Sequence, residues 1–187
     1  MNSMSSSKST NLKGNIIVAS DKSISHRALI LGSLVTGNIK IKNLLESDDV
    51  IATADALKAL GVAVNKKDGF WEVSGNGIGN LFGSNYRLDM GNSGTGSRLI
   101  MGLIAGSDVE ATILGDQSLS KRPMKRIILP LSKTGAIFDD PNNDNLPLTL
   151  RGSKIPLPIE YISPVSSAQI KSSILLTGLS STGTTTI

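Results

Sequence analysis

The sequence predicts an α/β (α+β) fold made of repeated strand-helix-strand-helix-strand-strand units (βαβαββ), with inner helices and outer sheets. Three segments share one pattern: a polar stretch with Ser, an apolar helix, a turn of small residues and a strand. They begin near Ser23, Ser93 and Ser167. Spacings of 70 and 74 residues between these starts indicate an internal repeat. The third helix, from Ala168, is apolar on almost every face, which predicts burial on all sides.

The first unit follows residues 1–11, a Ser-rich stretch without an apolar run, which we expect to be a disordered tail and not a signal peptide. An apolar helix begins near Ser23. A second helix opens at the acidic pair Asp48-Asp49, since carboxylates favour the positive end of a helix dipole, and it stops at Gly61. The strands expected in this unit are 39–41, 62–64 and 71–73.

The second unit repeats this order. Its first helix begins near Ser93, and Pro123 opens its second helix because proline suits a first helical turn. Gly135 follows the end of that helix. The strands expected here are 111–114, 136–138 and 146–150. The third unit has its helix from Ala168 and a strand at 184–187, so we expect this unit to be incomplete and the chain to be a piece of a longer protein.

The composition excludes several kinds of site. No cysteine is present, which rules out disulfides, thiolate zinc sites and a cysteine nucleophile, and agrees with a cytoplasmic protein. His26 is the single histidine, so neither a histidine-rich metal site nor a Ser-His-Asp triad is expected. We therefore expect no metal and no cofactor. No apolar run reaches the length of about 18 residues that a membrane span needs.

The charge balance and the aromatic content favour small anionic ligands. The 19 Lys and Arg residues exceed the 15 Asp and Glu residues by 4. This mild excess suits small anionic substrates and falls short of a strongly basic nucleic-acid-binding domain. Aromatic residues make up only 3% of the chain, too few to build a surface on which bases stack.

Each inner helix is expected to begin with small hydroxyl, amide or glycine residues and a cation within one turn. Exposed N–H groups and the helix dipole make such starts anion sites, which together predict a pocket for a ligand with several negative groups. The segments are 21–27, 91–98 and 166–171, with a fourth basic cluster of Lys121, Arg122, Lys125 and Arg126. Two simpler interpretations stay open: these residues only cap helices, and Arg98 and Arg126 only form structural ion pairs. We expect His26 to be a local hydrogen-bonding residue rather than a catalytic base.

The same stretches resemble the 5-enolpyruvylshikimate-3-phosphate (EPSP) synthase family over nearly the whole chain after the tail. The matching segments are DKSISHRALIL from Asp21, SDDV from Ser47, GNSGTGSRL from Gly91, GDQSLSKRPM from Gly115, LPLTLRG from Leu146 and SSAQIKSSILLTGL from Ser166. One departure is Ala19-Ser20, where the family usually has Pro-Gly.

The resemblance implies an enolpyruvyl-transferase-like inverted α/β barrel, in a full enzyme with two domains of three units each and substrates between them. It implies that residues 12–20 form a first strand and crossover belonging to the other domain. Residues 21–187 would form a substrate-binding domain of three units, truncated in the third. The other half of the enzyme is the expected partner of this chain, and the full enzyme is expected to be a monomer.

Members of this family transfer the enolpyruvyl group of phosphoenolpyruvate to the 5-hydroxyl of shikimate 3-phosphate. The resemblance implies that Lys22 is a catalytic residue. The residues implied for shikimate 3-phosphate are Lys22, Ser23, Arg27, Ser167, Ala168 and Gln169. Those implied for phosphoenolpyruvate are Lys22, Gly94, Arg122 and Gln169. The family's proton-transfer residues lie outside this chain, so we expect no turnover by this polypeptide alone.

Two other functions stay open. The sister family that transfers enolpyruvyl to UDP-N-acetylglucosamine shares the fold. It usually uses a loop cysteine, absent here, and begins its first helix with Lys-Asn where this sequence has Lys22-Ser23. The second alternative is a non-catalytic anion- or RNA-binding module that uses the basic helix starts. The scarcity of aromatic residues argues against single-stranded RNA as its ligand.

Overall fold

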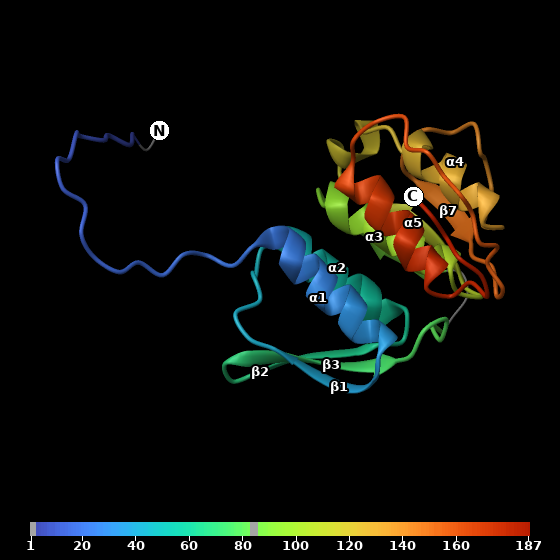
Figure 1. The fold of residues 1–187 in the computed structure, drawn as a ribbon, viewed down its shortest axis with the longest axis horizontal. Coiled ribbons are helices and arrows are strands. Elements are labelled where there is room, and N and C mark those ends of the chain that lie inside the picture. The colour runs from blue at the N-terminus through green and yellow to red at the C-terminus, as the bar shows by residue number, and fades with distance from the viewer. Residues whose placement is uncertain (1–2, 83–85) are drawn as a thin grey trace.

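The computed structural model describes residues 3–82 and 86–187, and Figure 1 shows two α/β bodies that follow each other along the chain. The first body packs two helices against a three-stranded sheet in the order β1-β3-β2. Both strand pairs in this sheet are antiparallel. Its elements are α1 (Lys22–Leu34), β1 (Thr36–Ile41), α2 (Asp48–Ala59), β2 (Ala63–Lys67) and β3 (Phe70–Asn76).

The second body has a four-stranded sheet in the order β4-β5-β7-β6, in which β4 runs parallel to β5 and the other pairs are antiparallel. Its elements are β4 (Tyr86–Asp89), α3 (Gly94–Ala105), β5 (Glu110–Leu114), the 3₁₀ turn η1 (Leu119–Lys121), α4 (Lys125–Lys133), β6 (Ile137–Phe138) and β7 (Leu148–Arg151). A third stretch adds α5 (Ala168–Gly178) and a parallel bridge between Glu160 and Thr186.

The predicted mixed α/β class and the repeat order are confirmed. The second body contains the complete order strand-helix-strand-helix-strand-strand, and the first body contains the last five of these elements. Gly61 and Gly135 follow the second helix of each body with φ values of 84° and 100°. This left-handed conformation favours glycine and ends a helix, which is why both positions could be identified from the sequence.

One strand expectation needs correction, and another stays a prediction. The segment 12–20 pairs with no strand of the described chain, and the strand expected there is one that would join the other domain. Its apolar side chains are therefore exposed, Ile16 at 86% and Ile17 at 103%. At the other end of the chain, the strand expected at 184–187 is reduced to the single bridge at Thr186.

Two helix expectations also need correction. The second helix of the second body begins at Lys125 and not at Pro123, since Met124 is its N-cap residue. The helix α5 is not buried on all sides: Leu175 and Leu179 are 44% and 48% exposed. They lie on a face of α5 that borders α1, where Leu31 is also half exposed.

The inner helices α3 and α5 run side by side and in parallel (Figure 1). A Cβ atom on Gly102 would lie 2.4 Å from the main-chain oxygen of Ser173, so only glycine allows this approach. One turn later, Gly106 lies against Thr177 and Ser180. The residue numbers rise together along both helices, which fixes their parallel direction.

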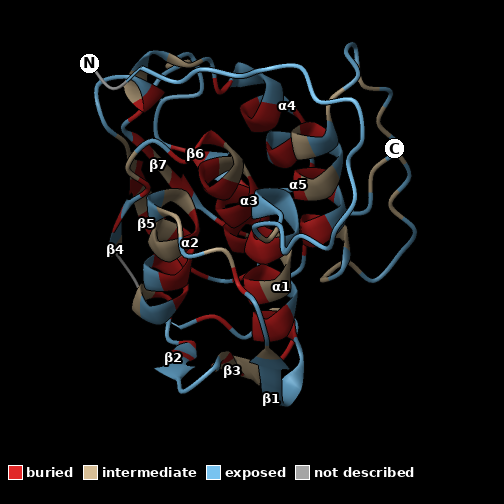
Figure 2. Cartoon of the chain, turned by 90° about the vertical axis from the view of Figure 1, so that its left-hand side faces the viewer, coloured by how far each residue is buried: buried red, intermediate tan, exposed pale blue. Residues whose placement is uncertain are grey.

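The core lies between these helices and the two sheets, and Figure 2 shows α3 as the most completely buried helix. The two bodies close their cores in the same way. A Cβ atom on Gly75, near the end of β3, would lie 2.2 Å from the main-chain oxygen of Val35. A Cβ atom on Gly152, just after β7, would lie 1.8 Å from that of Ile104. Of the helices described, none combines the length and apolar character needed to cross a bilayer.

Candidate functional site

The starts of α1, α3 and α5 lie together at one end of the helix bundle. Gln169 at the start of α5 donates from Nε2 to Oγ1 of Thr95 at the start of α3, over 3.0 Å. Thr53 of α2 stands between α1 and α3. Its Oγ1 lies 2.8 Å from Nδ1 of His26, and a Cβ atom on Gly96 would lie 2.6 Å from the same oxygen. The structure thus brings together the three helix starts that the sequence pattern identifies.

A side chain caps each of these helix starts. The acceptors are Asp21, Ser93 and Ser167, which lie 2.7, 3.1 and 3.4 Å from the N–H groups of Ile24, Gly96 and Ile170. The capping interpretation is therefore correct for these three side chains. A cap takes one of the several N–H groups at a helix start, so capping and anion binding are compatible.

Arg98 links the starts of α3 and α5 to the segment before α4. Its Nη1 donates to the main-chain oxygen of Gly94 (2.9 Å) and to Oε1 of Gln169 (3.1 Å). Its Nη2 donates to the main-chain oxygen of Pro123 (3.1 Å). Sequence analysis placed Arg98 among the helix-start cations but assigned it no ligand and no partner.

The cations around the start of α3 form no salt bridge within the described residues, although the charge of Arg122 acts on the Asp116 carboxylate. No salt bridge within the described residues involves Arg98, Arg122 or Arg126, so the ion-pair interpretation of Arg98 and Arg126 is wrong. Burial lowers the pKa of Arg98, and the neighbouring Arg122 and Arg126 lower it further by repulsion. A phosphate placed here would relieve that repulsion, because it supplies the missing negative charge.

Arg122 is held by the loop that precedes α3. Its guanidinium group donates to the side-chain and main-chain oxygens of Asn92 and to Oγ of Ser118. Asn92 in turn donates from Nδ2 to Oδ2 of Asp116 over 2.7 Å. The backbone N–H of Leu119, and then Asn92, hold the pKa of Asp116 below its usual range, so this carboxylate stays ionised. The segments beginning at Gly91 and Gly115 therefore act as one unit that positions Arg122.

Gly94 lies directly under two guanidinium groups. A Cβ atom at this position would lie 2.9 Å from Nη1 of Arg122 and 3.0 Å from Nη1 of Arg98. Glycine therefore leaves the first turn of α3 open to these cations, and any larger side chain would displace their tips.

The start of α1 carries a different charge arrangement. Lys22 forms a salt bridge of 2.7 Å with Asp49, at the start of α2. Arg27 donates to the main-chain oxygen of Ser23 over 3.0 Å and to Oγ of Ser172 in α5 over 2.7 Å. The cation of Lys22 is thus paired with a carboxylate, whereas the partners of Arg27 among the described residues are neutral oxygens.

His26 is completely buried behind this helix start. Its Nδ1 is bonded to Thr53, and its Nε2 has no hydrogen-bond partner among the described residues. Burial lowers the pKa of His26, with Asp49 acting in the opposite direction. A buried imidazole with no exposed face agrees with the expected local hydrogen-bonding role.

The start of α5 opens onto a groove of about 700 Å³. Ser167 and Ala168 line it together with Lys171 and Ser172. Gln169 points elsewhere, toward Arg98 and Thr95. The residues predicted for substrate binding on α5 are therefore divided between this groove and the α3 cluster.

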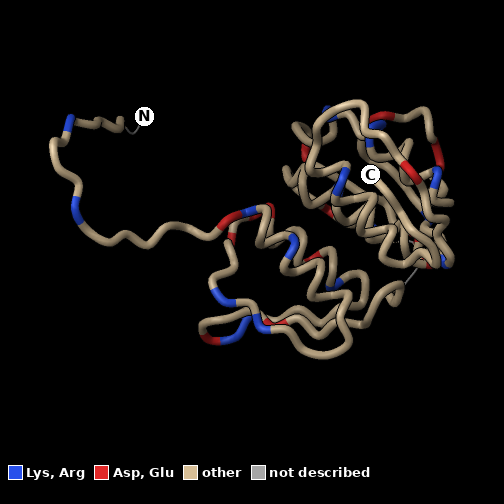
Figure 3. Tube along the Cα trace, viewed as in Figure 1, with Lys and Arg blue, Asp and Glu red and all other residues tan. Residues whose placement is uncertain are grey.

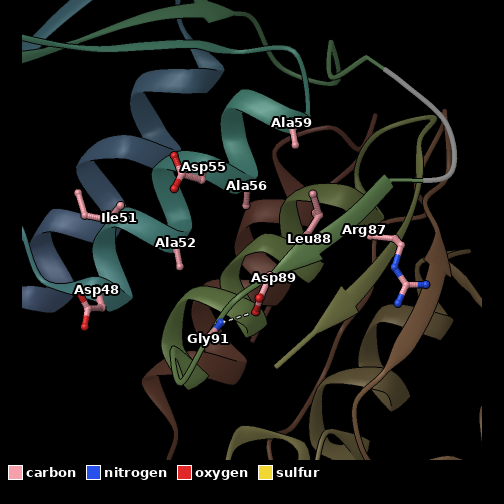
Figure 4. A pocket seen from close by; sticks show the side chains of 10 residues that line it. All are labelled: Asp48, Ile51, Ala52, Asp55, Ala56, Ala59, Arg87, Leu88, Asp89 and Gly91. Carbon is pink, nitrogen blue, oxygen red and sulfur yellow. Dashed lines mark hydrogen bonds between the residues drawn. The ribbon is translucent and has the colours of Figure 1, made fainter. Parts of the chain in front are cut away.

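A second groove, shown in Figure 4, has more acidic than basic side chains, so it would repel an anionic ligand. It has a volume of about 410 Å³ and lies between α2 and β4. Asp48, Asp55 and Asp89 line it against a single cation, Arg87. None of the residues predicted to contact the two substrates lines this groove, although Gly91 of the segment 91–98 does. Figure 3 shows the same mixing of charge elsewhere, with basic and acidic residues interspersed along the described chain.

Sequence reasoning missed three residues that contact the predicted ones. Asp49 was interpreted only as a helix cap, and Thr53 and Ser172 were not considered. Asp49 pairs with Lys22 across 27 residues, and Ser172 accepts from Arg27 across 145 residues. In the sequence, the one usable signal is the carboxylate of Asp49 at the start of the helix that follows Lys22.

Comparison with known proteins identifies the family. A sequence model described as EPSP synthase (3-phosphoshikimate 1-carboxyvinyltransferase) matches residues 6–187. The 3-phosphoshikimate 1-carboxyvinyltransferase of Parvibaculum lavamentivorans is 52% identical over 186 residues, covering 99% of this chain and 41% of the relative. The enzyme of the same name from Novosphingobium aromaticivorans is 52% identical over 177 residues, covering 94% and 40%.

A solved structure agrees. The EPSP synthase of Acinetobacter baumannii matches with a TM-score of 0.83 and 37% identity, over 90% of this chain and 38% of that one. The chain thus spans about 41% of the length of the first of these relatives. On sequence and structure alike, the chain belongs to the EPSP synthase (3-phosphoshikimate 1-carboxyvinyltransferase) family.

Proposed function

We propose that this chain supplies the anion-binding part of a 3-phosphoshikimate 1-carboxyvinyltransferase. In this reaction C3 of phosphoenolpyruvate gains a proton and the 5-hydroxyl oxygen of shikimate 3-phosphate, losing its proton, bonds to C2. Phosphate then leaves from C2 of the tetrahedral intermediate while C3 loses a proton, which restores the C2–C3 double bond and gives 5-enolpyruvylshikimate 3-phosphate. The observation that supports the proposal best is the arginine cluster at the shared helix starts, which forms no salt bridge within the described residues, because both substrates are multiply charged anions.

The phosphate of phosphoenolpyruvate is assigned to the start of α3. Gly94 gives it access to the helix backbone, and Arg122 supplies a guanidinium group already oriented by Asn92. The Nε2 group of Gln169 has two N–H donors, of which Thr95 takes one. Lys22 is assigned the catalytic role of a positive charge, which its salt bridge with Asp49 holds in place.

Shikimate 3-phosphate is assigned to the starts of α1 and α5. Arg27 bridges these helices through Ser172, so its guanidinium group lies where both helix starts are within reach. The groove beside α5 exposes Ser167 and Ala168. Lys22, Ser23 and Gln169 complete the proposed contacts.

The exposed segment 12–20 is assigned to a second domain. Its side chains at Ile16, Ile17 and Val18 are 86%, 103% and 74% exposed, which is unfavourable for β-branched residues that have no packing partner. A sheet edge of the other half of the enzyme would cover them. Residues 21–187 then form the substrate-binding domain. The proton-transfer groups are assigned to the other half, so no phosphate should be released from the two substrates by this chain alone.

The test is a titration of the chain with shikimate 3-phosphate, monitored by backbone amide NMR. We expect the largest shifts at Ser23, Ser167 and Gln169. Arg27→Ala should weaken binding about tenfold or more, the effect of removing a charge-assisted hydrogen bond. The matched control is Arg87→Ala, which removes an exposed arginine from the acidic groove of Figure 4.

Equal losses in the two variants would show that binding follows net charge and not the helix starts. Shifts centred on the acidic groove would place the ligand elsewhere. Either result would reject the proposed site.

A further inference from the structure

Arg98 is in a position to decide which way the Gln169 amide faces. An arginine side chain has five N–H donors and no acceptor. Its partner in Gln169 must therefore be the carbonyl oxygen Oε1, which lies 3.1 Å from Nη1 of Arg98. The NH₂ group of Gln169 then points the other way, toward Thr95.

Thr95 cannot make this choice. Its hydroxyl both donates and accepts, so it could satisfy either end of the amide. If the amide were reversed, Gln169 would present a carbonyl oxygen where the proposed ligand brings phosphate oxygens. That arrangement is repulsive, whereas the observed one leaves an N–H donor on Nε2 for the ligand.

Arg98 is itself firmly held. Its other two bonds are to the main-chain oxygens of Gly94 and Pro123, which belong to the start of α3 and to the segment before α4. No carboxylate in the described chain forms a salt bridge with it, so its orientation follows from three oxygen acceptors on three separate segments. A planar guanidinium group can serve three such acceptors at once, but a lysine cannot do so in the same geometry.

We propose that Arg98 is a positioning residue that fixes the Gln169 amide with its NH₂ group toward the anion site at the start of α3. This inference rests on the proposed function, since it takes that site to bind the phosphate of the substrate. Arg98 acts through Gln169 and not as a direct ligand of the phosphate.

A double-mutant cycle with inorganic phosphate separates the two roles. Arg98→Met removes the donors and keeps most of the side-chain length. In the otherwise unchanged chain it should weaken phosphate binding about tenfold, the effect of losing one charge-assisted hydrogen bond. In the Gln169→Ala background the same change should cost less, about threefold, because the residue through which Arg98 acts is already gone and only the charge of Arg98 is then lost. Phosphate affinity is measured from the amide shifts of Gly94 and Thr95, and Arg151→Met, an exposed arginine on β7, is the control.

The side-chain NH₂ resonances of Gln169 give a second measurement that needs no ligand. In the unchanged chain we expect a well-dispersed pair, and in Arg98→Met a pair that moves to the position of a free glutamine. This readout remains decisive if the unchanged chain does not bind phosphate, a result that would count against the proposed function and not against the positioning role.

The positioning role is overturned if Arg98→Met weakens phosphate binding equally in both backgrounds, or if the Gln169 resonances do not move. If Arg98→Met does not fold, Thr95→Val decides. Because Arg98 still holds Oε1 in that variant, phosphate affinity should fall by less than about threefold, the effect of one neutral hydrogen bond. A complete loss of phosphate binding in Thr95→Val would show that Thr95 orients the amide, and it would overturn the proposal.

Discussion

The two α/β bodies share the order of five elements but differ in how the cations at the starts of their inner helices are paired. In the first body the ammonium group of Lys22 lies 2.7 Å from the Asp49 carboxylate. Within the described residues, the hydrogen bonds of Arg98 and Arg122 in the second body go to carbonyl, amide and hydroxyl oxygens. A repeated backbone thus provides a lysine paired with a carboxylate in one body and, in the other, a pair of arginines without a salt bridge in the described part of the chain. The positions of the helix starts therefore follow from the repeat in the sequence. The side chains at each start determine how strongly it attracts a charged ligand group.

The largest predicted effect concerns the glycines that close both bodies. Gly75→Ala and Gly152→Ala each place a Cβ atom within 2.2 Å of a main-chain oxygen, which cannot rotate away. We expect each change to lower the free energy of unfolding by about 3 kcal/mol, measured by chemical denaturation. The control is Gly32→Ala, whose Cβ atom would lie 3.4 Å from Val73, an ordinary contact. If only one of the two variants were destabilised, the packing of the two bodies would differ more than their shared architecture indicates.

The second effect tests the cationic cluster directly. Gly94→Ala pushes on the guanidinium groups of Arg122 and Arg98, so phosphate affinity at the start of α3 should fall about tenfold. Stability should not fall with it, because both contacts are to flexible side-chain tips and alanine is the better helix former. Amide NMR titration and a melting curve measure the two quantities. A parallel loss of stability would mean that the backbone, and not the arginines, had moved.

The third effect is a pH dependence that only the first body should show. Burial lowers the pKa of His26 from its ordinary value of 6.5, so the unfolded chain binds this proton more readily than the folded chain. The contribution of His26 to the free energy of unfolding is therefore complete well above pH 6.5, and it declines as the pH falls through 6.5 and below. The second body has Ser97 before Arg98, where the first has His26 before Arg27, and serine does not titrate in this range.

We expect the free energy of unfolding to fall between pH 7.5 and pH 5.5, and this slope to be smaller in His26→Gln. Denaturation at both pH values, with and without the substitution, makes the comparison. An unchanged slope in His26→Gln would assign the pH dependence to the carboxylates instead.

The smallest effect concerns the salt bridge that distinguishes the first body. The side chains of Lys22 and Asp49 are 51% and 23% exposed, so Asp49→Asn should change the free energy of unfolding by less than about 1 kcal/mol. The same change frees Lys22 and makes the start of α1 resemble that of α3, so phosphate affinity should rise. Asp55→Asn, which breaks the exposed pair with Lys58, is the control. A fall in phosphate affinity would mean that Asp49 orients Lys22 for binding.

The predictable part of the fold is the part set by neighbours in sequence. Helix starts and stops depend on capping residues and on glycines such as Gly61 and Gly135, which act within a turn. Strands depend on distant partners, which is why β4 was not located and why the segment 12–20, apolar and β-branched, has no strand partner among the described residues.

In the candidate site, too, the features set by sequence neighbours were predictable and those set by distant partners were not. Small polar residues beside a cation mark each helix start, and the structure brings these starts together. The contacts of Arg98 could not be predicted, because two of its acceptors are main-chain oxygens, which every residue type possesses. Asp49 and Ser172 escaped prediction because their partners Lys22 and Arg27 lie on other helices.

The close contact at Gly102 gives the site a mechanical weak point away from any ligand. Gly102 lies eight residues after Gly94, about 12 Å along the axis of α3. A larger side chain at this position would push α3 and α5 apart. This displacement would lengthen the hydrogen bond between Thr95 and Gln169 at the starts of the two helices. Affinity for anions at these helix starts should therefore be sensitive to substitutions in the middle of the helix pair, about 12 Å from Gly94.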